Sequence, residues 1–425
     1  MNFTTVPNLI ALAILVIVFW AISRKAAGGQ VQLWLVGWVL VLLHFVAEFP
    51  VIDGAPWSQM AAAVSLGSLI LASVAFLISV SLIASDRSRQ AQLAAAIAIP
   101  ALAYTTGTIW EISSHTYYYF LIAIGVVAPL LLYWRHSRQS MIHTGAVTLS
   151  TVVAAAVTAW GIVSGKPEVG IIVILAALNF AVAILYWSYH KRATAGVLTA
   201  VIGFALWGGV FPAAFLLGMF APAVKVETEV WNIPKYLVAV GMILTLLEEQ
   251  IARSTHLAYH DELTDLPNRR LLEDRLDQAL AQADRIGGKV AVLVIDLDHF
   301  KEVNDTFGHR VGDLALREVV TRLASRIRSS DTMARSGGDE FTVVSQVVNR
   351  DGAAVLRSAL ASALTDPIVI EGKQVRIGLS VGIALYPDDG NNADQLHASA
   401  DRAMYVAKRA ARNSAPIVFL PQPTS

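Results

Sequence analysis

Acidic residues near the end of the chain have the clearest chemical potential. Asp296 and Asp298 end an apolar run, and Asp339-Glu340 directly follows the glycine pair Gly337-Gly338. Carboxylates suit the hard cation Mg²⁺, which in turn holds phosphates. Paired glycines remove side chains where a nucleotide must approach the backbone closely. Each feature alone has an ordinary explanation, because a Gly-Gly-Asp is usually a turn and an Asp after a strand is usually a cap. Together they predict a magnesium–nucleotide site.

Alternating strands and helices must position these residues. Hydrophobic periodicity predicts strands that carry the acidic residues and helices that pack against them. The glycine pair lies between two short strands, which is typical of a hairpin. The order resembles a ferredoxin-like palm with additions, an α+β fold. The expected strands are 290–295, 332–336, 341–344 and 375–384, and the expected helices are 312–328, 353–364 and 394–412.

Residues 257–416 resemble the catalytic GGDEF domain of diguanylate cyclases. The five-residue signature stands at 337–341, and other family motifs follow the same order along the domain. Two positions depart from the family pattern, because Ala411 and Asp265 stand where glycine is usual. The matching residues are 261–270 (DELTDLPNRR), 296–301 (DLDHFK), Asn304-Asp305, Gly308-His309, Gly312-Asp313, Arg335, 380–383 (SVGI), Ala400-Asp401, Tyr405, Lys408, Arg412 and Asn413.

The resemblance implies an enzyme that condenses two GTP molecules into cyclic di-GMP and pyrophosphate as a dimer of half-sites. The cofactor would be Mg²⁺ or Mn²⁺. Asp296, Asp339 and the Leu297 carbonyl would bind it, with Glu340 assisting the metal or deprotonating the attacking hydroxyl. Asn304 and Asp313 would recognise guanine. The remaining substrate-binding residues would be Gly337 and Gly338 next to the nucleotide, and Lys301, Arg335, Lys408 and Arg412 on the phosphates.

A second family feature lies just before the signature. Arg328 and Asp331 have the spacing of the inhibitory site that binds the product in this family. An arginine can donate to phosphate and guanine, and a carboxylate can accept from guanine. Charges after a helix are commonly only solvated, which is the alternative. The expected consequence is feedback inhibition by cyclic di-GMP.

The composition divides the chain of 425 residues into two halves. Residues 1–250 carry only 20 charged side chains, whereas 251–425 carry 44. The whole chain holds 32 basic and 32 acidic residues, which gives no sign of nucleic-acid binding. It has no cysteine, so disulfides and thiolate chemistry are excluded. The first half predicts a protein of the lipid bilayer.

Nine apolar runs are long enough to be membrane helices, with an uncertainty of one. Basic residues cluster in alternate loops, which predicts an N-terminus outside and a C-terminus in the cytoplasm. The family resemblance implies that the membrane is a bacterial inner membrane. We expect a sensory membrane domain at 1–248, a helical connector at 249–260, the catalytic domain at 257–416 and a tail at 417–425. The runs are 7–22, 31–49, 59–84, 92–111, 117–134, 143–163, 169–188, 196–220 and 230–248.

Two pairs of ionisable residues lie near the outer ends of predicted spans. His44 and Glu48 are four residues apart, as are Glu111 and His115, and this spacing would place each pair on one helical face. Together they predict an outward pocket for a metal or a small polar ligand. The stronger alternative is that polar residues at span ends reach headgroups or water.

Two other functions compete with a regulated membrane cyclase. One is a catalytically silent receptor that binds cyclic di-GMP at Arg328 and Asp331, although Asp296, Asp339 and Glu340 are intact. The other is a transporter or channel with an appended cyclase. The sequence shows no obvious internal repeat or run of intramembrane charges that would mark a transport pathway.

Overall fold

We describe the fold from a computed structural model of the chain. It describes residues 6–24, 29–49, 57–81, 86–136, 141–224, 226 and 228–412. The chain divides into two compact units, Met1–Gln250 and Ile251–Ser425. Each unit has its own core, and the change in composition near residue 250 falls at the same place.

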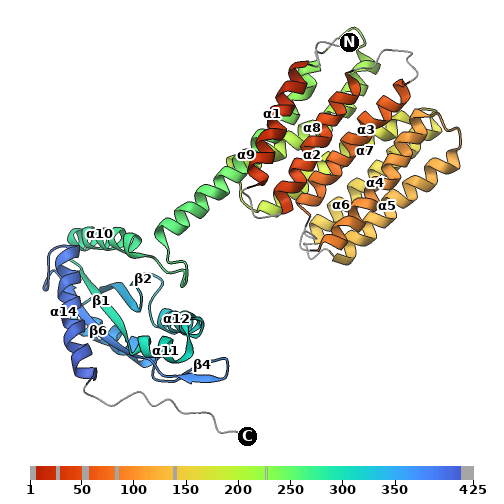
Figure 1. Ribbon diagram of the computed structural model, residues 1–425. Helices are drawn as coiled ribbons and strands as arrows, with labels where there is room; N and C mark the ends of the chain where they lie inside the picture. Colours follow the sequence, from red (N-terminus) through yellow and green to blue (C-terminus); the bar gives the residue numbers. More distant parts are fainter. Residues whose placement is uncertain are drawn as a thin grey trace, which may run out of the picture. The chain divides into compact units, whose positions relative to one another are not determined.

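Helices are the only regular secondary structure in the described residues of the first unit (Figure 1). Consecutive helices pack side by side. The last one, α9, continues past the unit boundary to Tyr259. The helices are α1 Val6–Ser23, α2 Gly29–Glu48, α3 Ser58–Ser79, α4 Arg87–Ile109, α5 His115–His136, α6 Met141–Val163, α7 Glu168–His190, α8 Ala195–Phe220 and α9 Thr228–Tyr259.

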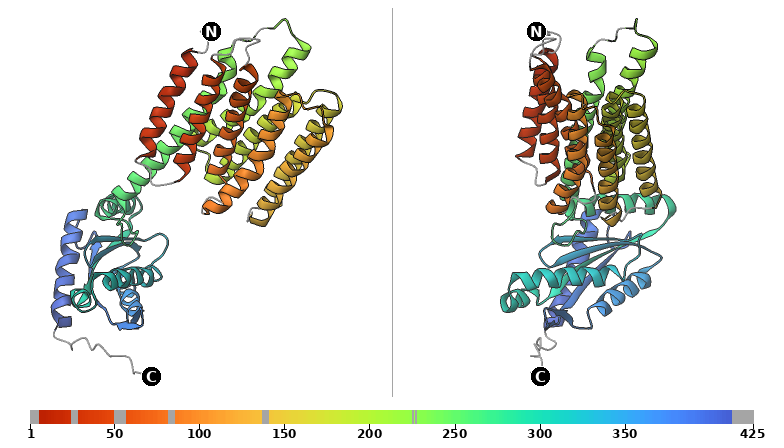
Figure 2. Two further views of the ribbon diagram at one scale, coloured as in Figure 1. Left: turned by 45° about the vertical axis from the view of Figure 1, so that its right-hand side comes forward. Right: turned by 90° about the vertical axis from the view of Figure 1, so that its right-hand side faces the viewer.

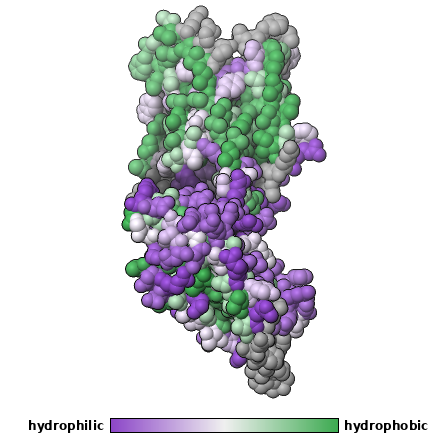
Figure 3. Space-filling view, turned by 90° about the vertical axis from the view of Figure 1, so that its left-hand side faces the viewer, coloured by the Kyte–Doolittle hydropathy of each residue, from purple (hydrophilic) through white to green (hydrophobic). Residues whose placement is uncertain are grey.

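Eight of these helices are long and apolar enough to cross a membrane, judged over the described residues. The described apolar stretch of α6, Thr148–Val163, is shorter. Large apolar side chains are exposed along the helices, and hydrophobic residues cover most of the helical surface visible in Figure 3. Such a surface is costly in water and suits lipid.

Glycines allow the helices of this unit to pack closely. A Cβ on Gly196 would lie 2.3 Å from the backbone of Thr245, and one on Gly241 would lie 2.3 Å from that of Ala200. These contacts hold α8 against α9, as small residues do between membrane helices. The interior beside them is aromatic, with Trp34, Trp38, Phe76, Tyr186, Phe204 and Trp207 fully buried.

The second unit is an α+β domain built on a four-stranded sheet. The strand order is β2-β3-β1-β6, and every neighbouring pair is antiparallel. This is the ferredoxin-like order, as expected. The sheet strands are β1 Lys289–Asp298, β2 Thr332–Gly337, β3 Glu340–Val347 and β6 Gly378–Tyr386; the helices are α10 Arg269–Ile286, α11 Phe300–Phe307, α12 His309–Ala324, α13 Arg350–Ala363 and α14 Ala393–Arg412.

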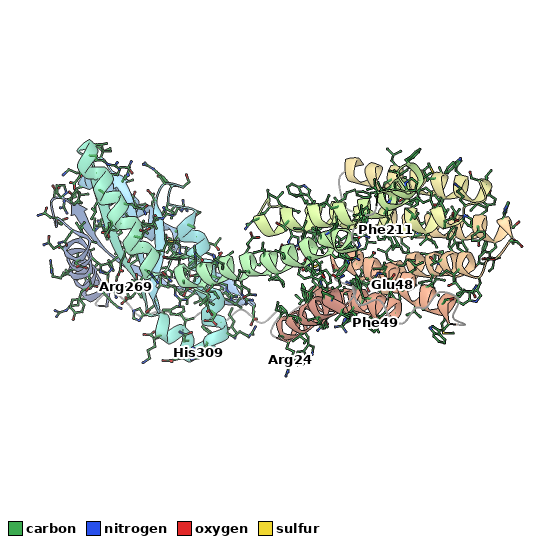
Figure 4. The ribbon with its side chains drawn as sticks, turned by 90° about the horizontal axis from the view of Figure 1, so that it is seen from above. Arg24, Glu48, Phe49, Phe211, Arg269 and His309 are labelled. Atoms are coloured by element: carbon green, nitrogen blue, oxygen red, sulfur yellow. The ribbon has the colours of Figure 1, made fainter. Side chains whose placement is uncertain are left out.

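Helices cover both faces of the sheet (Figure 2). Alternate β1 residues enter two cores: Leu293 packs with residues of α11, α12 and α13, and Val292 packs with residues of α10 and α14. A strand buried on both faces has a continuous apolar sequence rather than an alternating one. Arg269 and His309, labelled in Figure 4, mark the starts of α10 and α12.

Two expectations for this unit need correction. The strand expected over 375–384 is in fact two strands, because β5 (Lys373–Val375) pairs with β4 (Ile368–Ile370) in a separate hairpin and β6 begins at Gly378. The helix expected over 312–328 begins earlier, at His309, and ends at Ala324. In the first case a turn separates two strands that apolar periodicity alone had joined. In the second case the apolar pattern did not mark the turns at which the helix begins and ends.

Candidate functional site

Strand pairing brings the two acidic motifs together. Asp296 of β1 lies opposite Glu340 of β3, and the Leu297 amide donates to the Asp339 carbonyl over 3.2 Å. The β2–β3 turn needs its glycines, since Gly337 and Gly338 have φ values of 155° and 52°. Apart from its chain neighbours, no described residue has an atom within 4 Å of a Cβ built on either glycine, so the hairpin is open to a ligand.

Helix α14 brings a lysine to the same place. Lys408 Nζ donates to Asp296 Oδ1 over 2.6 Å, and the Asp296 side chain is only 6% exposed. The helix can lie this close because of Gly382 in β6. A Cβ there would be 2.0 Å from the Ala400 carbonyl oxygen and 2.2 Å from the Met404 nitrogen.

Negative charge accumulates around Glu340. Burial raises the pKa of its carboxyl, and the nearby carboxylates of Asp296, Asp339 and Asp401 raise it further, while Lys408 opposes them. Like charges gathered in this way attract a cation.

The oxygen donors fit Mg²⁺ supplied together with a nucleotide better than a ready-made metal cage. Among the described residues, no three acidic or imidazole groups form a site that could hold a metal by themselves. Mg²⁺ is usually held by one or two carboxylates together with substrate phosphates. Asp296, Asp339 and Glu340, with the Leu297 carbonyl, match that requirement.

The expected guanine-binding residues lie on two consecutive helices. Asn304 lies on α11 and Asp313 on α12. A Cβ on Gly312 would lie only 1.9 Å from Asn304 Oδ1, so the glycine makes room for that amide. Lys301 is exposed one turn before Asn304 on α11. The role of Gly312 was not apparent from the sequence, where it appeared only as part of a motif.

Arg335 connects the glycine hairpin with the turn at the start of the domain. Its Nε and Nη2 atoms donate to the Gly338 carbonyl over 3.0 and 2.7 Å. Its Nη1 atom donates to Asp261 Oδ1 over 2.8 Å, and that oxygen also accepts from the amide and hydroxyl of Thr264. Arg335 is thus already bonded to protein, and its role in positioning the hairpin had not been expected.

The charge on Asp261 should stabilise the domain in a pH-dependent way. Burial raises its pKa, but hydrogen bonds from Thr264 and Arg335 outweigh burial, and the net pKa is lowered. The stabilisation is therefore complete above the unfolded pKa of about 3.9 and is lost as the pH falls through the folded value. Asp261→Asn should lower the unfolding free energy by about 1 kcal/mol at pH 7.

Calorimetric unfolding at pH 7 and pH 3 checks this prediction. The difference between the wild type and the variant should be largest at pH 7 and should narrow as the pH falls below about 3.9 toward the lowered folded pKa. Asp277→Asn is the matched control, because Asp277 is exposed on α10. An equal effect of both substitutions at pH 7 would contradict the assigned role of Asp261.

Arg328 and Asp331 lie in the turn before β2. The Asp331 carboxylate accepts from the Arg328 amide over 2.9 Å and from the Ser345 hydroxyl over 2.8 Å. Arg328 is exposed. The carboxylate is thus fixed in place by protein donors, while the arginine side chain faces solvent.

The sequence predicts that two pairs of ionisable residues in the first unit each share a helical face, and the structure bears this out for one pair and contradicts it for the other. His44 and Glu48 share a face of α2, and both contact Ser65, at 2.7 Å from His44 Nδ1 and 3.1 Å from Glu48 Oε1. Glu111 and His115 do not share a helical face. Helix α4 ends at Ile109, Glu111 has a φ of 54°, and His115 begins α5. The spacing of four spans a turn, and both residues are exposed.

One expected phosphate-binding side chain lies outside the described residues. Arg412 is the last residue of α14, but its side chain is not described. Among the described side chains of α14, Lys408 is therefore the cation that this helix contributes to the site.

Comparisons with known proteins all indicate the same family. Residues 258–414 match the family model described as "Diguanylate cyclase, GGDEF domain". The chain is 40% identical over 239 residues to the bifunctional diguanylate cyclase/cyclic di-GMP phosphodiesterase MucR of Pseudomonas aeruginosa, covering 50% of this chain and 35% of that protein. It is 42% identical over 180 residues to the diguanylate cyclase TpbB of the same species, covering 42% and 41%.

One solved structure is similar to this chain in sequence. The crystal structure of the GGDEF domain of TpbB from P. aeruginosa is 40% identical, with a TM-score of 0.34, and the match covers 35% of this chain and 92% of that one. The present chain spans about two fifths or less of the curated relatives MucR and TpbB. Its second unit is a GGDEF domain, and the chain therefore belongs to the family of GGDEF-domain proteins, which has diguanylate cyclases among its members.

Proposed function

We propose that this protein is a membrane-bound diguanylate cyclase that condenses two GTP molecules into cyclic di-GMP and pyrophosphate. The observation that carries the proposal is the pairing of Asp296 with Glu340 across β1 and β3, beside an open glycine hairpin. Asp339 lies in the turn before Glu340, so three acidic side chains gather beside this hairpin.

The chain's residues would bind and orient the nucleotide. Asp296, Asp339 and Glu340 would hold Mg²⁺, which neutralises developing charge on the phosphates and favours ionisation of the attacking 3′-hydroxyl. The Asn304 amide would donate to and accept from the guanine edge, and the Asp313 carboxylate would accept from its N–H groups. Lys301 and Lys408 would contact phosphate, and Lys408 would exchange its bond to Asp296 for one to the ligand.

The reaction requires two copies of the chain. One site of this kind holds one GTP, and the 3′-hydroxyl of each nucleotide must attack the α-phosphorus of the other. A homodimer with facing half-sites would supply the required orientation, which contributes much of the rate in such reactions.

The first unit would lie in a bacterial inner membrane with the GGDEF domain in the cytoplasm. Eight helices of sufficient length and hydropathy among the described residues support membrane insertion. The basic residues of alternate loops support the orientation. They are Arg24, Lys25, Arg87, Arg89, Arg135, Arg138, Lys191 and Arg192.

The direct test is incubation of the purified full-length protein in nanodiscs with GTP and Mg²⁺, with mass spectrometry of the products. Cyclic di-GMP and pyrophosphate in a 1:2 ratio are expected, and chelation of the metal should stop their formation. Binding of cyclic di-GMP without turnover of GTP would instead favour a silent receptor.

We also expect the product to inhibit the enzyme through Arg328 and Asp331. The fixed Asp331 carboxylate and the exposed Arg328 side chain can accept from guanine and donate to phosphate. Arg328→Ala should weaken inhibition by added cyclic di-GMP by about 10–100-fold, the loss of one or two charge-assisted hydrogen bonds. Initial rates across a product titration measure this effect.

Arg326→Ala is the matched control for that titration, because Arg326 is exposed two residues earlier. It should retain the wild-type inhibition curve. Equal inhibition of wild type and Arg328→Ala would place the product elsewhere.

A further inference from the structure

A cavity lies inside the helical unit, bordered by α4, α5, α6 and α7 and by the end of α3 (Figure 1). Its volume is about 230 Å³. Protein interiors are close-packed, and voids larger than a water molecule are few. A cavity of about 150 Å³ with apolar walls binds benzene, so this one has room for about nine carbon atoms. It is therefore large enough to hold a ligand.

The walls of this cavity offer hydrocarbon surface and little else. None of the described residues that line it carries a charge. Two of the hydroxyl groups there already donate to the protein: Tyr104 Oη to the Pro167 carbonyl over 2.9 Å, and Thr158 Oγ1 to the Ala154 carbonyl over 2.8 Å. Because a hydroxyl has a single O–H, neither has a donor left for a ligand. The chemistry of the walls therefore selects an apolar molecule.

The cavity is elongated along the helices. The residues that line it recur over 93–104 of α4, 150–158 of α6 and 173–185 of α7. At about 1.5 Å per residue, these stretches are about 12 to 18 Å long. A space for about nine carbon atoms that extends over such a length is narrow. It suits an extended chain of methylene groups better than a compact ring system.

Small side chains leave this space open. Ala154 and Ala155 of α6 line the cavity, as do Ala177 and Ala181 of α7. Leucine at such positions would fill it. Atoms that border an empty space lose the dispersion contacts that a close-packed neighbour would give, and the loss grows with the volume of the space. An apolar ligand would restore these contacts, which is the physical reason for it to bind.

Hydrocarbon would be at hand outside the same helices. Val127 and Leu131 of α5 and Val152 and Val153 of α6 are large apolar side chains that are exposed on the unit. In the proposed membrane location they would face lipid chains. An apolar cavity of this kind stays free of water. A hydrocarbon chain is thus the occupant that both the walls and the surroundings favour.

We propose that this cavity binds an extended aliphatic chain of about nine carbon atoms. Each methylene group transferred from water to such walls favours binding by about fourfold. The chain can belong to a free alkyl compound or to the acyl chain of a lipid, and the two sources are separated by experiment. This binding site goes beyond the proposed cyclase activity and does not depend on it.

The test is photolabelling of the full-length protein in nanodiscs, with the labelled residues identified by mass spectrometry. One arm uses a free aliphatic diazirine with a chain of about nine carbons. The other uses a phospholipid with a diazirine within its acyl chain. Residues that line the cavity should be labelled, and unlabelled nonane should displace the label. Adamantane, a compact hydrocarbon with a similar number of carbons, should displace much less of it. The probe that labels the cavity identifies the source of the chain.

Substitutions at the wall make the assignment specific. Ala154→Leu adds three carbon atoms that take the place of buried methylene groups of the ligand, so it should lower labelling of the other lining residues at least about tenfold. Ala177→Leu repeats this test from α7. Ala156→Leu is the matched control, because Ala156 is exposed on α6 and is not among the described residues that line the cavity. Labelling of the exposed Val153 should persist in all three variants, which shows that the helices remain folded in the bilayer.

The proposal is overturned by any of three results. They are a lack of nonane-sensitive labelling at the lining residues with both probes, equal displacement by adamantane and nonane, and wild-type labelling in both Ala154→Leu and Ala177→Leu. Because the measurement reads binding in the helical unit, it gives an answer whether or not the protein forms cyclic di-GMP.

Discussion

Glu340→Gln should reduce cyclic di-GMP formation by about 10²–10⁴-fold, the range typical when a group that moves a proton or stabilises charge is removed. The amide keeps the size of the side chain but can neither take a proton nor offer charge to a metal. Initial rates with saturating GTP and Mg²⁺ measure the loss. Glu273→Gln is the control, since Glu273 forms only an exposed ion pair with Arg269 on α10.

The same variant should not unfold the domain. Burial and the carboxylates of Asp296, Asp339 and Asp401 raise the pKa of Glu340, so its ionised form opposes folding. For a group with a raised folded pKa, the favourable contribution exists at low pH and is lost as the pH rises through that value. At pH 7 the neutral glutamine should therefore leave metal-free stability equal or higher. An inactive variant with a lower unfolding temperature would point to misfolding instead.

The local sequence pattern was enough to predict the strands that carry the acidic residues. The apolar run before Asp296 and the glycine pair before Asp339 each marked the end of a strand, and pairing of β1 with β3 placed them opposite each other. The turn glycines have positive φ values, which few other residues adopt, so their position in the sequence carried direct structural information.

Contacts between distant segments could not be predicted in this way. The bond of Arg335 to Asp261 joins residues 74 positions apart, and the bond of Lys408 to Asp296 joins residues 112 apart. Neither follows from periodicity, because each depends on how helices and turns pack on the sheet. The family resemblance named Arg335 and Lys408 as phosphate-binding residues, whereas the structure shows that both are already bonded to protein.

In the helical unit, prediction from residue spacing succeeded for one pair of residues and failed for another. A spacing of four correctly placed His44 and Glu48 on one face of α2, because the helix continues through both. The same spacing failed for Glu111 and His115, because α4 ends before Glu111 and nothing in the apolar pattern marked that end.

Gly312→Ala should raise the KM for GTP at least tenfold while leaving the domain folded. The new methyl group would lie 1.9 Å from Asn304 Oδ1, so the amide must move away from its present position. A displacement of about 1 Å in a positioning group can cost up to about 100-fold in rate. Alanine also favours a helix over glycine by about 1 kcal/mol, which offsets part of the strain. Steady-state kinetics and calorimetric unfolding together check this prediction.

Gly352→Ala is the matched control, because that glycine also lies in a helix but has no atom closer than 3.7 Å to the added Cβ. It should leave the KM unchanged. A similar rise in KM for both variants would assign the effect to general helix stiffening.

A double-mutant cycle then identifies the cause of the defect. If Gly312→Ala acts by displacing the Asn304 amide, it should add little to the KM of an Asn304→Ala variant, because the displaced group is already absent. Additive effects would mean that the methyl group disturbs α12 or Asp313 directly. Strong non-additivity would show that a glycine without any functional atom sets guanine recognition by leaving space for its neighbour.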